Sequence, residues 1–331
     1  MTTDVRTSGP RGEEAREDRA LHPWQRWLQL RARSAGRKAD EREERGRRQQ
    51  WFLLAGTCPG SRRSAPSPQT LWPIYPPVQS FWADPFVWAR DGRRFVFFEE
   101  FPFATPRGHI SALELNAQAR PVGDAIPVLQ EPYHLSYPFL FELDGELFMM
   151  PEKKESGGLD LYRCTSFPRG WTREHRIMEG VGIVDGNLFE HEGRWWLFCA
   201  TKGRRSRINE TLTAFHAEHP LSRRWTPHPR NPLVRDFRWA RPGGRIFLDD
   251  AGRLLRPTQD CVRRYGYGLG ISQILQLTTT VFAERRIWYS SGEDAGGWRA
   301  MHHMDWHDGI MVMDAQRLLR AQGSGPGSED S

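Results

Sequence analysis

The sequence predicts an all-β fold, a five-bladed β-propeller with four-stranded blades. The first observation behind this prediction is a hairpin pattern that recurs about every fifty residues, a repeat length typical of propeller blades, and begins at Asp84, Tyr137, Asp185 and Arg241. In each copy a Pro or Gly follows that residue, and a short apolar run, a turn containing Gly and a second apolar run come next. This order indicates two antiparallel strands joined by a tight turn.

The second observation is that another pair of strands follows each hairpin, which gives four strands per blade. The segments that align with one another are 109–114, 159–164, 211–216 and 273–277. A shorter fifth copy covers 301–314, with Asp308-Gly309 at the expected turn. We expect the strand at 51–55 to complete this last blade and close the ring, because closure removes the unpaired edges that an open sheet leaves.

The two ends of the chain differ in composition from the propeller, for which we predict the bounds 51–318. Residues 1–50 form a charged N-terminal extension that is disordered or helical: 1–20 have few apolar residues, whereas 21–50 contain Trp24, Trp27 and Leu28 before a charged tract. This second part is either a helix docked on the propeller or, the interpretation that we favour, a loosely held tail. Residues 319–331 are rich in Gly, Ser and acidic residues and are expected to form a disordered tail.

Composition argues against several classes of function. The net charge of +6 comes with basic residues spread along the chain and without a basic stripe interleaved with aromatic residues, so we expect no nucleic-acid partner. The four cysteines have no CxxC spacing, so no zinc ribbon or redox motif is indicated and no cofactor is expected. The N-terminus lacks an apolar core and no long apolar run follows it, so the sequence predicts a cytoplasmic protein without a membrane span.

The repeat also predicts where polar side chains meet. The first strand of every blade lines the central channel of a propeller, so the residues that begin the copies form one ring, namely Asp84, Tyr137, Asp185 and Arg241. The residues seven positions after each turn glycine form a second ring, namely Glu99, Glu152, Ala200 and Gln259. Because both rings are mostly polar, we predict a binding or catalytic site at one mouth of the channel.

Residues 50–315 contain a specific set of motifs: ADPFVW with FFEE, HLSYPFLFE with FMMPE, LYRCTSFPRGW, VDGNLFEHEGRWWLF, ARPGG and RPTQDC. This set resembles the N-terminal domain found in plant glucosamine inositolphosphorylceramide transferases and in many bacterial proteins. The resemblance implies the five-bladed propeller of glycoside hydrolase families 43 and 32, here in a bacterial stand-alone form. The glycosyltransferase domain of the plant proteins has no room in 331 residues, so transferase activity is not implied.

The resemblance also implies catalytic residues. The Ala-Asp-Pro motif places the general base at Asp84, and a second aspartate that orients the substrate matches Asp185. Where these hydrolases have the general acid, on blade four, this chain has Arg241, whose guanidinium stays charged and does not donate a proton at neutral pH. We therefore predict Glu152 as the acid, with its blade-one equivalent Glu99 as the substitute. Inverting hydrolysis needs two such carboxyl groups about 6.5–9.5 Å apart, one of them protonated.

Further residues are candidates for substrate binding, because sugars are bound by planar polar groups and aromatic faces: Glu99, His134, Tyr137, Arg241, Arg256, Gln259, Asp260, Tyr265 and His303. Of these, Arg241 suits an anionic sugar or a phosphate. The histidines and aspartates at 302–308 suggest a metal site, but their spacing matches no established ligand pattern, so we expect no metal and one histidine, His303, in the channel. A structural interpretation stays open for Asp84 and Asp185, as caps that bond the backbone at strand ends.

Two functions are compatible with these residues. The first is a carbohydrate-active enzyme that hydrolyses a glycosidic bond or transfers a glycosyl group on a sugar or glycoconjugate in the channel. The second is a non-catalytic propeller that binds a glycan or acts as a scaffold beside a separate glycan-assembly enzyme. The crowd of acids at the channel favours the first function, whereas the missing blade-four acid favours the second.

Overall fold

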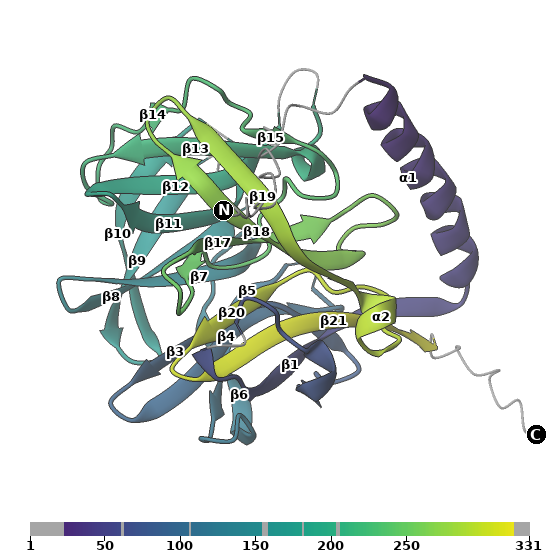
Figure 1. Ribbon diagram of the computed structural model, residues 1–331. Helices are drawn as coiled ribbons and strands as arrows, with labels where there is room; N and C mark the ends of the chain where they lie inside the picture. Colours follow the sequence, from purple (N-terminus) through teal and green to yellow (C-terminus); the bar gives the residue numbers. More distant parts are fainter. Residues whose placement is uncertain are drawn as a thin grey trace, which may run out of the picture.

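The computed structural model describes residues 23–60, 63–105, 107–153, 158–180, 182–202 and 206–320. The disorder predicted for 1–20 lies outside these residues, as does most of the tail predicted at 319–331; its first two residues, 319 and 320, end the last strand instead. Five antiparallel sheets are arranged in a ring (Figure 1), which confirms the predicted five-bladed propeller. Of the helices in the described ranges, none combines the length and the apolar character that crossing a bilayer requires.

The first two blades follow the predicted order of four strands, each beginning with the strand that lines the channel. Blade one consists of β3 (Ser80–Arg90), β4 (Arg93–Pro102), β5 (His109–Leu115) and β6 (Pro121–Leu129). Blade two consists of β7 (Leu135–Leu143), β8 (Glu146–Lys153), β9 (Gly158–Ser166) and β10 (Gly170–Glu179). The turns between the first two strands of these blades are Asp91-Gly92 and Asp144-Gly145, and all four residues have positive φ, as the hairpin pattern predicts.

Blades three and four are less regular. Blade three consists of β11 (Ile183–His191), β12 (Arg194–Thr201), β13 (Thr211–Ala217) and β14 (Thr226–Pro227), with β15 (Val234–Arg235) also paired to β13 and the short helix η3 (Ile208–Glu210) before β13. Blade four consists of β16 (Phe247–Leu248), β17 (Leu254–Asp260), β18 (Gly268–Leu277) and β19 (Phe282–Ser291). Its inner strand is therefore only a remnant of those in the other blades.

Blade five joins the two ends of the propeller. Its inner strands are β20 (Met304–His307) and β21 (Ile310–Arg320), and its outer strands are β1 (Arg47–Thr57) and β2 (Trp72–Ile74), with η2 (Pro68–Thr70) before β2 and α2 (Gly292–Gly296) before β20. Strand β1 pairs with β21 along its whole length, from Arg47 opposite Arg320 to Thr57 opposite Ile310. The predicted closure of the ring is thus confirmed, by a strand longer than the apolar run at 51–55 alone.

The repeat has a clear backbone signature at the channel. Asp84, Tyr137 and Asp185 have φ of 53°, 47° and 53°, and the pairing of each inner strand skips residues there. Such bulges re-aim a side chain, and a left-handed aspartate or tyrosine is uncommon enough to mark a position that the fold strongly constrains. Arg241, expected to be the fourth member, lies before the short strand β16 and has no such bulge.

Apolar side chains of neighbouring blades pack against each other to form the core. The largest cluster lies mainly between blades one, two and three and contains Phe86, Phe97, Phe139 and Phe148. Trp171, Trp195 and Trp225 pack at its border and so contribute to blade packing. This interior holds the inner strands in place and so fixes the positions of the channel residues.

Residues 23–43 form a docked helix, α1 (Pro23–Glu43), rather than a loosely held tail (Figure 1, purple). The face that docks is mostly polar, and its Leu30 packs against Phe237, Cys261 and Val262. Arg26 donates two hydrogen bonds to the buried Glu210, at 2.7 and 3.0 Å, and Gln29 donates to Asp236 at 2.7 Å. Asp40 accepts from Arg264 at 2.8 Å. Glu210 and Arg264 lie in the loops that follow the second strands of blades three and four, at the end of the propeller where Glu99 and Glu152 also lie, so α1 lies on the face that carries the predicted site.

The docking of α1 depends on the missing side chain of Gly36. A Cβ at this residue would lie 2.1 Å from the carbonyl oxygen of Arg263. We expect Gly36→Val to push the helix off the propeller and to lower the hydrogen-exchange protection of 23–43 at least about tenfold. The neighbouring Ala35 is exposed, so Ala35→Val is the matched control. Equal protection in the two variants would show that the close approach does not hold the helix.

Candidate functional site at the channel mouth

Four predicted acids meet at one end of the channel. Asp84 and Asp185 lie on the bulges of β3 and β11, and Glu99 and Glu152 lie near the ends of β4 and β8. The backbone N–H of Asp185 donates to a carboxyl oxygen of Glu152 at 3.1 Å, which joins blades two and three. Asp84, Glu99 and Asp185 are buried, whereas Glu152 is partly exposed.

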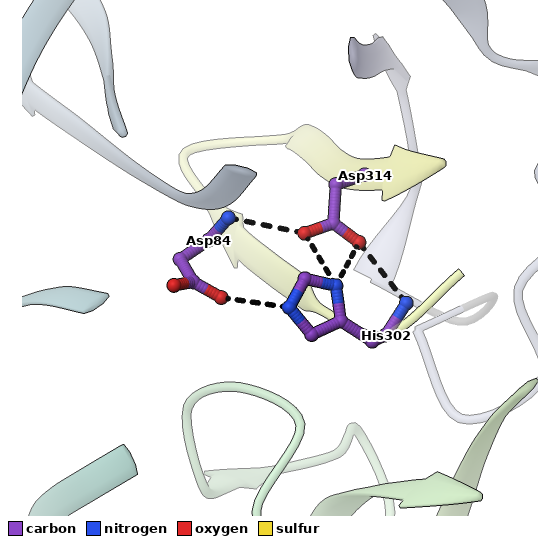
Figure 2. Close-up of side chains that lie close together, drawn as sticks. All are labelled: Asp84, His302 and Asp314. Atoms are coloured by element: carbon purple, nitrogen blue, oxygen red, sulfur yellow. Dashed lines mark hydrogen bonds and ion pairs between the residues drawn. The ribbon is translucent and has the colours of Figure 1, made fainter. Parts of the chain in front are cut away.

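Asp84 is part of a chain of hydrogen-bonded charges (Figure 2). His302 lies between two carboxylates, with Nε2 3.1 Å from Asp84 Oδ1 and Nδ1 2.9 Å from Asp314. Burial alone would lower the pKa of His302, but the Asp314 and Asp84 carboxylates raise it to about 10, so the ring is an imidazolium at neutral pH. This positive charge stabilises the carboxylate of Asp84, whose second oxygen accepts no hydrogen bond from the described residues.

Asp314 fixes the geometry of this hydrogen-bonded group of Asp84, His302 and Asp314. Its carboxylate accepts backbone N–H groups from Asp84, His302 and His303, each at 3.0 Å. Neither Asp314 nor the role of His302 was predicted from the sequence. The available signal was the charge itself, because Asp314 follows the apolar run Ile310–Met313 and a buried carboxylate needs partners.

The histidine and aspartate cluster at 302–308 does not assemble into one site. His303 is completely buried, with its ring 4.6 Å from that of Phe86, and burial lowers its pKa to about 3. His303 therefore lies buried below the mouth and is not the histidine that faces the ligand. This corrects the prediction that His303 binds the substrate. Asp305 pairs with Arg245 at 2.8 Å. Asp84, His302 and Asp314 lie close enough to ligate one cation, but hydrogen bonds already engage both ring nitrogens.

Glu152 has the properties of a proton donor. Its burial, together with the charge of Asp185, raises its pKa to about 8 against the opposing effect of Arg241. It is thus protonated over most of the neutral range and, being partly exposed, can be reached by a ligand. Glu99 is more deeply placed, and burial raises its pKa well above the ordinary value. His134 Nδ1 accepts from Gly108 N–H at 2.8 Å, so its Nε2–H points at Glu99, 3.3 Å away.

Arg241 faces the same mouth but is committed to Asp185. Its Nε and Nη2 donate to the two oxygens of that carboxylate, the latter at 3.2 Å, and its Nη1 donates to Asn209 at 2.6 Å. The guanidinium also lies 4.9 Å from the ring centre of Tyr265, which is 39% exposed. Gln259 supports the pair from below, through a 3.4 Å hydrogen bond to Asp185. The predicted Arg241, Tyr265 and Gln259 thus come together with the acids.

Three other predicted residues do not reach the mouth surface. Arg256 is sealed inside blade four, where it binds Glu284 and the carbonyls of residues 239 and 240. Asp260 points away from Gln259, because adjacent strand residues face opposite sides, and accepts from Tyr289 at 3.1 Å. Tyr137 is buried below the mouth, where its hydroxyl accepts from Asn187 at 2.9 Å.

The sequence of this chain is similar to that of a known protein family. Residues 75–322 match the family described as "Glucosamine inositolphosphorylceramide transferase 1, N-terminal". Glucosamine inositolphosphorylceramide transferase 1 of Oryza sativa subsp. japonica is 34% identical over 267 residues, which cover 75% of this chain and 34% of that protein. Its Arabidopsis thaliana counterpart is 35% identical over 257 residues, covering 71% and 33%. The chain thus spans about a third of the length of the curated relatives that it matches.

Solved structures are similar in fold at low sequence identity. The catalytic domain of the Coprinopsis cinerea GH62 α-L-arabinofuranosidase has a TM-score of 0.50 at 12% identity, covering 71% of this chain and 90% of that one. Zg3597, a family 117 glycoside hydrolase from Zobellia galactanivorans, has a TM-score of 0.50 at 10% identity, covering 81% and 90%. These likenesses concern the fold alone.

Proposed function

Because the chain belongs to the family of the glucosamine inositolphosphorylceramide transferase N-terminal domain, we propose that it is a carbohydrate-active propeller that acts on a sugar or glycoconjugate at the channel mouth. A sugar ligand is supported by the name of the curated relatives, glucosamine inositolphosphorylceramide transferase, and by those of the glycoside hydrolases that are similar in fold. The reaction is hydrolysis of a glycosidic bond or transfer of the glycosyl group. One observation carries this proposal: a carboxylate, Asp84, and a protonated carboxyl, Glu152, occupy the same mouth.

These two groups suit the two proton transfers of glycoside cleavage. The carboxylate of Asp84, with one oxygen that accepts no hydrogen bond from the described residues, takes the proton of a water or of an acceptor hydroxyl while the oxygen of that water or hydroxyl attacks the sugar. Glu152 gives its proton to the leaving-group oxygen as the glycosidic bond breaks. His302 is the positioning residue, since it holds Asp84 in place and stabilises its charge. Tyr265, half-exposed beside Arg241, offers an aromatic face to the sugar.

The pKa of Glu152 gives this proposal a pH signature. An acid with a pKa raised to about 8 is protonated below that pH and loses its proton above it, so kcat is expected to fall as pH rises through about 8. Glu152→Gln removes the proton and is expected to lower kcat by about 10²–10⁴-fold, together with this limb of the profile. The measurement is kcat from pH 5 to 10 on a cleaved glycoside. A wild-type profile that stays flat from about pH 7 to 9 would exclude Glu152 as the acid.

A second candidate function rests on the pair of Arg241 and Asp185. At the blade-four position where the resemblance implies an acid, a guanidinium bound to a carboxylate is present instead. This arrangement favours a non-catalytic propeller that holds a glycan for a separate glycan-assembly enzyme. The expected result is then binding of a glycan without product release, in the wild type and in Asp84→Asn alike.

A further inference from the structure

A cavity of ≈ 530 Å³ lies between α1 and the propeller, beside the channel mouth. Tyr265 belongs to both places: it lines the cavity, and its ring contacts His302 and Arg241 of the mouth. The rest of the lining is strongly charged. Six of its side chains are arginines and three are acids: Arg33, Arg37, Arg207, Arg263, Arg264, Arg299, Asp40, Glu41 and Glu44.

Most of these arginines are neutralised by carboxylates. Asp40 lies 2.8 Å from Arg264 and 3.1 Å from Arg299. Arg263 is 3.0 Å from Glu293, and Arg37 is 3.7 Å from Glu41. Two are not: in the described ranges neither Arg33 nor Arg207 forms an ion pair, and the nearby Glu210 is engaged by Arg26.

Arg33 is held in place although it forms no ion pair in the described chain, where Glu210 and Asp260 act on it only from beyond ion-pair distance. It donates to the carbonyl of Cys261, its guanidinium lies 4.4 Å from the ring centre of Phe237, and its buried Nε has no hydrogen-bond partner among the described residues. Burial and, to a lesser extent, the nearby Arg207 lower its pKa, against the opposing effects of Cys261, Glu210 and Asp260. Two neighbouring guanidiniums without an ion-pair partner repel each other, and an oxyanion between them would offset that repulsion and satisfy the free donors.

We propose that this cavity is an oxyanion subsite, in which Arg33 and Arg207 bind a carboxylate or phosphate group carried by the sugar ligand of the mouth. The inference rests on the proposed function in that it takes the mouth to be the place where the sugar lies. Arg33 comes from α1, which precedes the residues that match the family. The preference for a charged ligand is therefore a property that the helix adds to the propeller.

Calorimetric titration of the full chain tests this subsite. The probes are inorganic phosphate, methyl glucoside, methyl glucuronide and glucose 6-phosphate, which distinguish a carboxylate from a phosphate on one sugar. We expect the charged sugars to bind at least about tenfold more tightly than the neutral one, and Arg33→Gln and Arg207→Gln each to abolish that difference. Arg31→Gln is the matched control, because Arg31 lies on the exposed side of α1 over Trp27.

The outcomes separate this inference from the proposed function. Charged sugars that bind no more tightly than methyl glucoside, or a preference that survives in Arg33→Gln, would overturn the subsite while leaving the mouth intact. Phosphate binding that is lost in Arg33→Gln and kept in Arg31→Gln supports the subsite even when no sugar binds. In that case the sugar at the mouth, and not the cavity, is contradicted.

Discussion

Asp84→Asn is expected to lower kcat on a glycoside that the wild-type protein cleaves by about 10²–10⁴-fold, the usual contribution of a positioned base. Binding of the same glycoside should change little, because Asn has nearly the same shape. Asn also tolerates the left-handed backbone that Asp84 adopts, with φ of 53°, and its carbonyl still accepts from His302. The substitution thus removes the charge with little strain, and steady-state kinetics with a parallel binding measurement show its effect.

Asp144→Asn is the matched control for this prediction. Asp144 also has φ of 53°, but it lies exposed in the turn between β7 and β8, away from the mouth. Its replacement should leave kcat unchanged. If Asp84→Asn kept more than about a tenth of the wild-type kcat, a positioned base at Asp84 would no longer be tenable.

Glu284→Ala is expected to lower the free energy of unfolding by about 3–5 kcal/mol, because it strands the charge of Arg256 in the interior. Both side chains are 0% exposed, and Arg256 donates to the two oxygens of Glu284 at 2.9 and 2.6 Å. For a domain of this size the loss corresponds to a fall in Tm of roughly 6–10 °C, measurable by calorimetry. The same loss should loosen the segment before Arg241, since Arg256 also holds the carbonyl of Ala240.

Two comparisons test the cause of that loss. In the exposed pair of Arg37 and Glu41, Glu41→Ala should change the free energy of unfolding by less than about 1 kcal/mol. The double variant Arg256→Met with Glu284→Leu removes both buried charges and should recover most of the stability lost in Glu284→Ala. A double variant as unstable as the single one would mean that the loss comes from packing or from the carbonyls of residues 239 and 240 that Arg256 binds, and not from an unpaired charge.

The fold was predictable because its signals are local and repeated. Turn glycines and the residue before each Pro or Gly set the register of every hairpin, so Asp84, Tyr137 and Asp185 were placed correctly at one backbone position. The closure by β1 followed from the need to pair an open edge. The prediction weakened in blade four, where the inner strand is nearly absent and Arg241 has no equivalent backbone geometry.

The site was harder to predict because its key contacts are long-range. His302 and His303 precede β20, so strand alternation did not indicate which of them turns to Asp84; Asp314 decides this by binding both backbone N–H groups. Arginine is a residue type that often binds ligands, and only the pairing of Arg256 with Glu284 shows that Arg256 is structural. The docking of α1 depends on polar contacts with residues more than 180 positions away, which no local pattern reveals.

The most direct test of a sugar site at the channel mouth is a crystal structure of Asp84→Asn soaked with a glycan that binds the wild-type protein. We expect a sugar ring at the mouth, against Tyr265 and within hydrogen-bond distance of Glu152 and of the new amide at position 84. A sugar bound elsewhere, for example in the cleft lined by Trp239, Asp260 and Tyr289, with none at the mouth, would contradict this proposal.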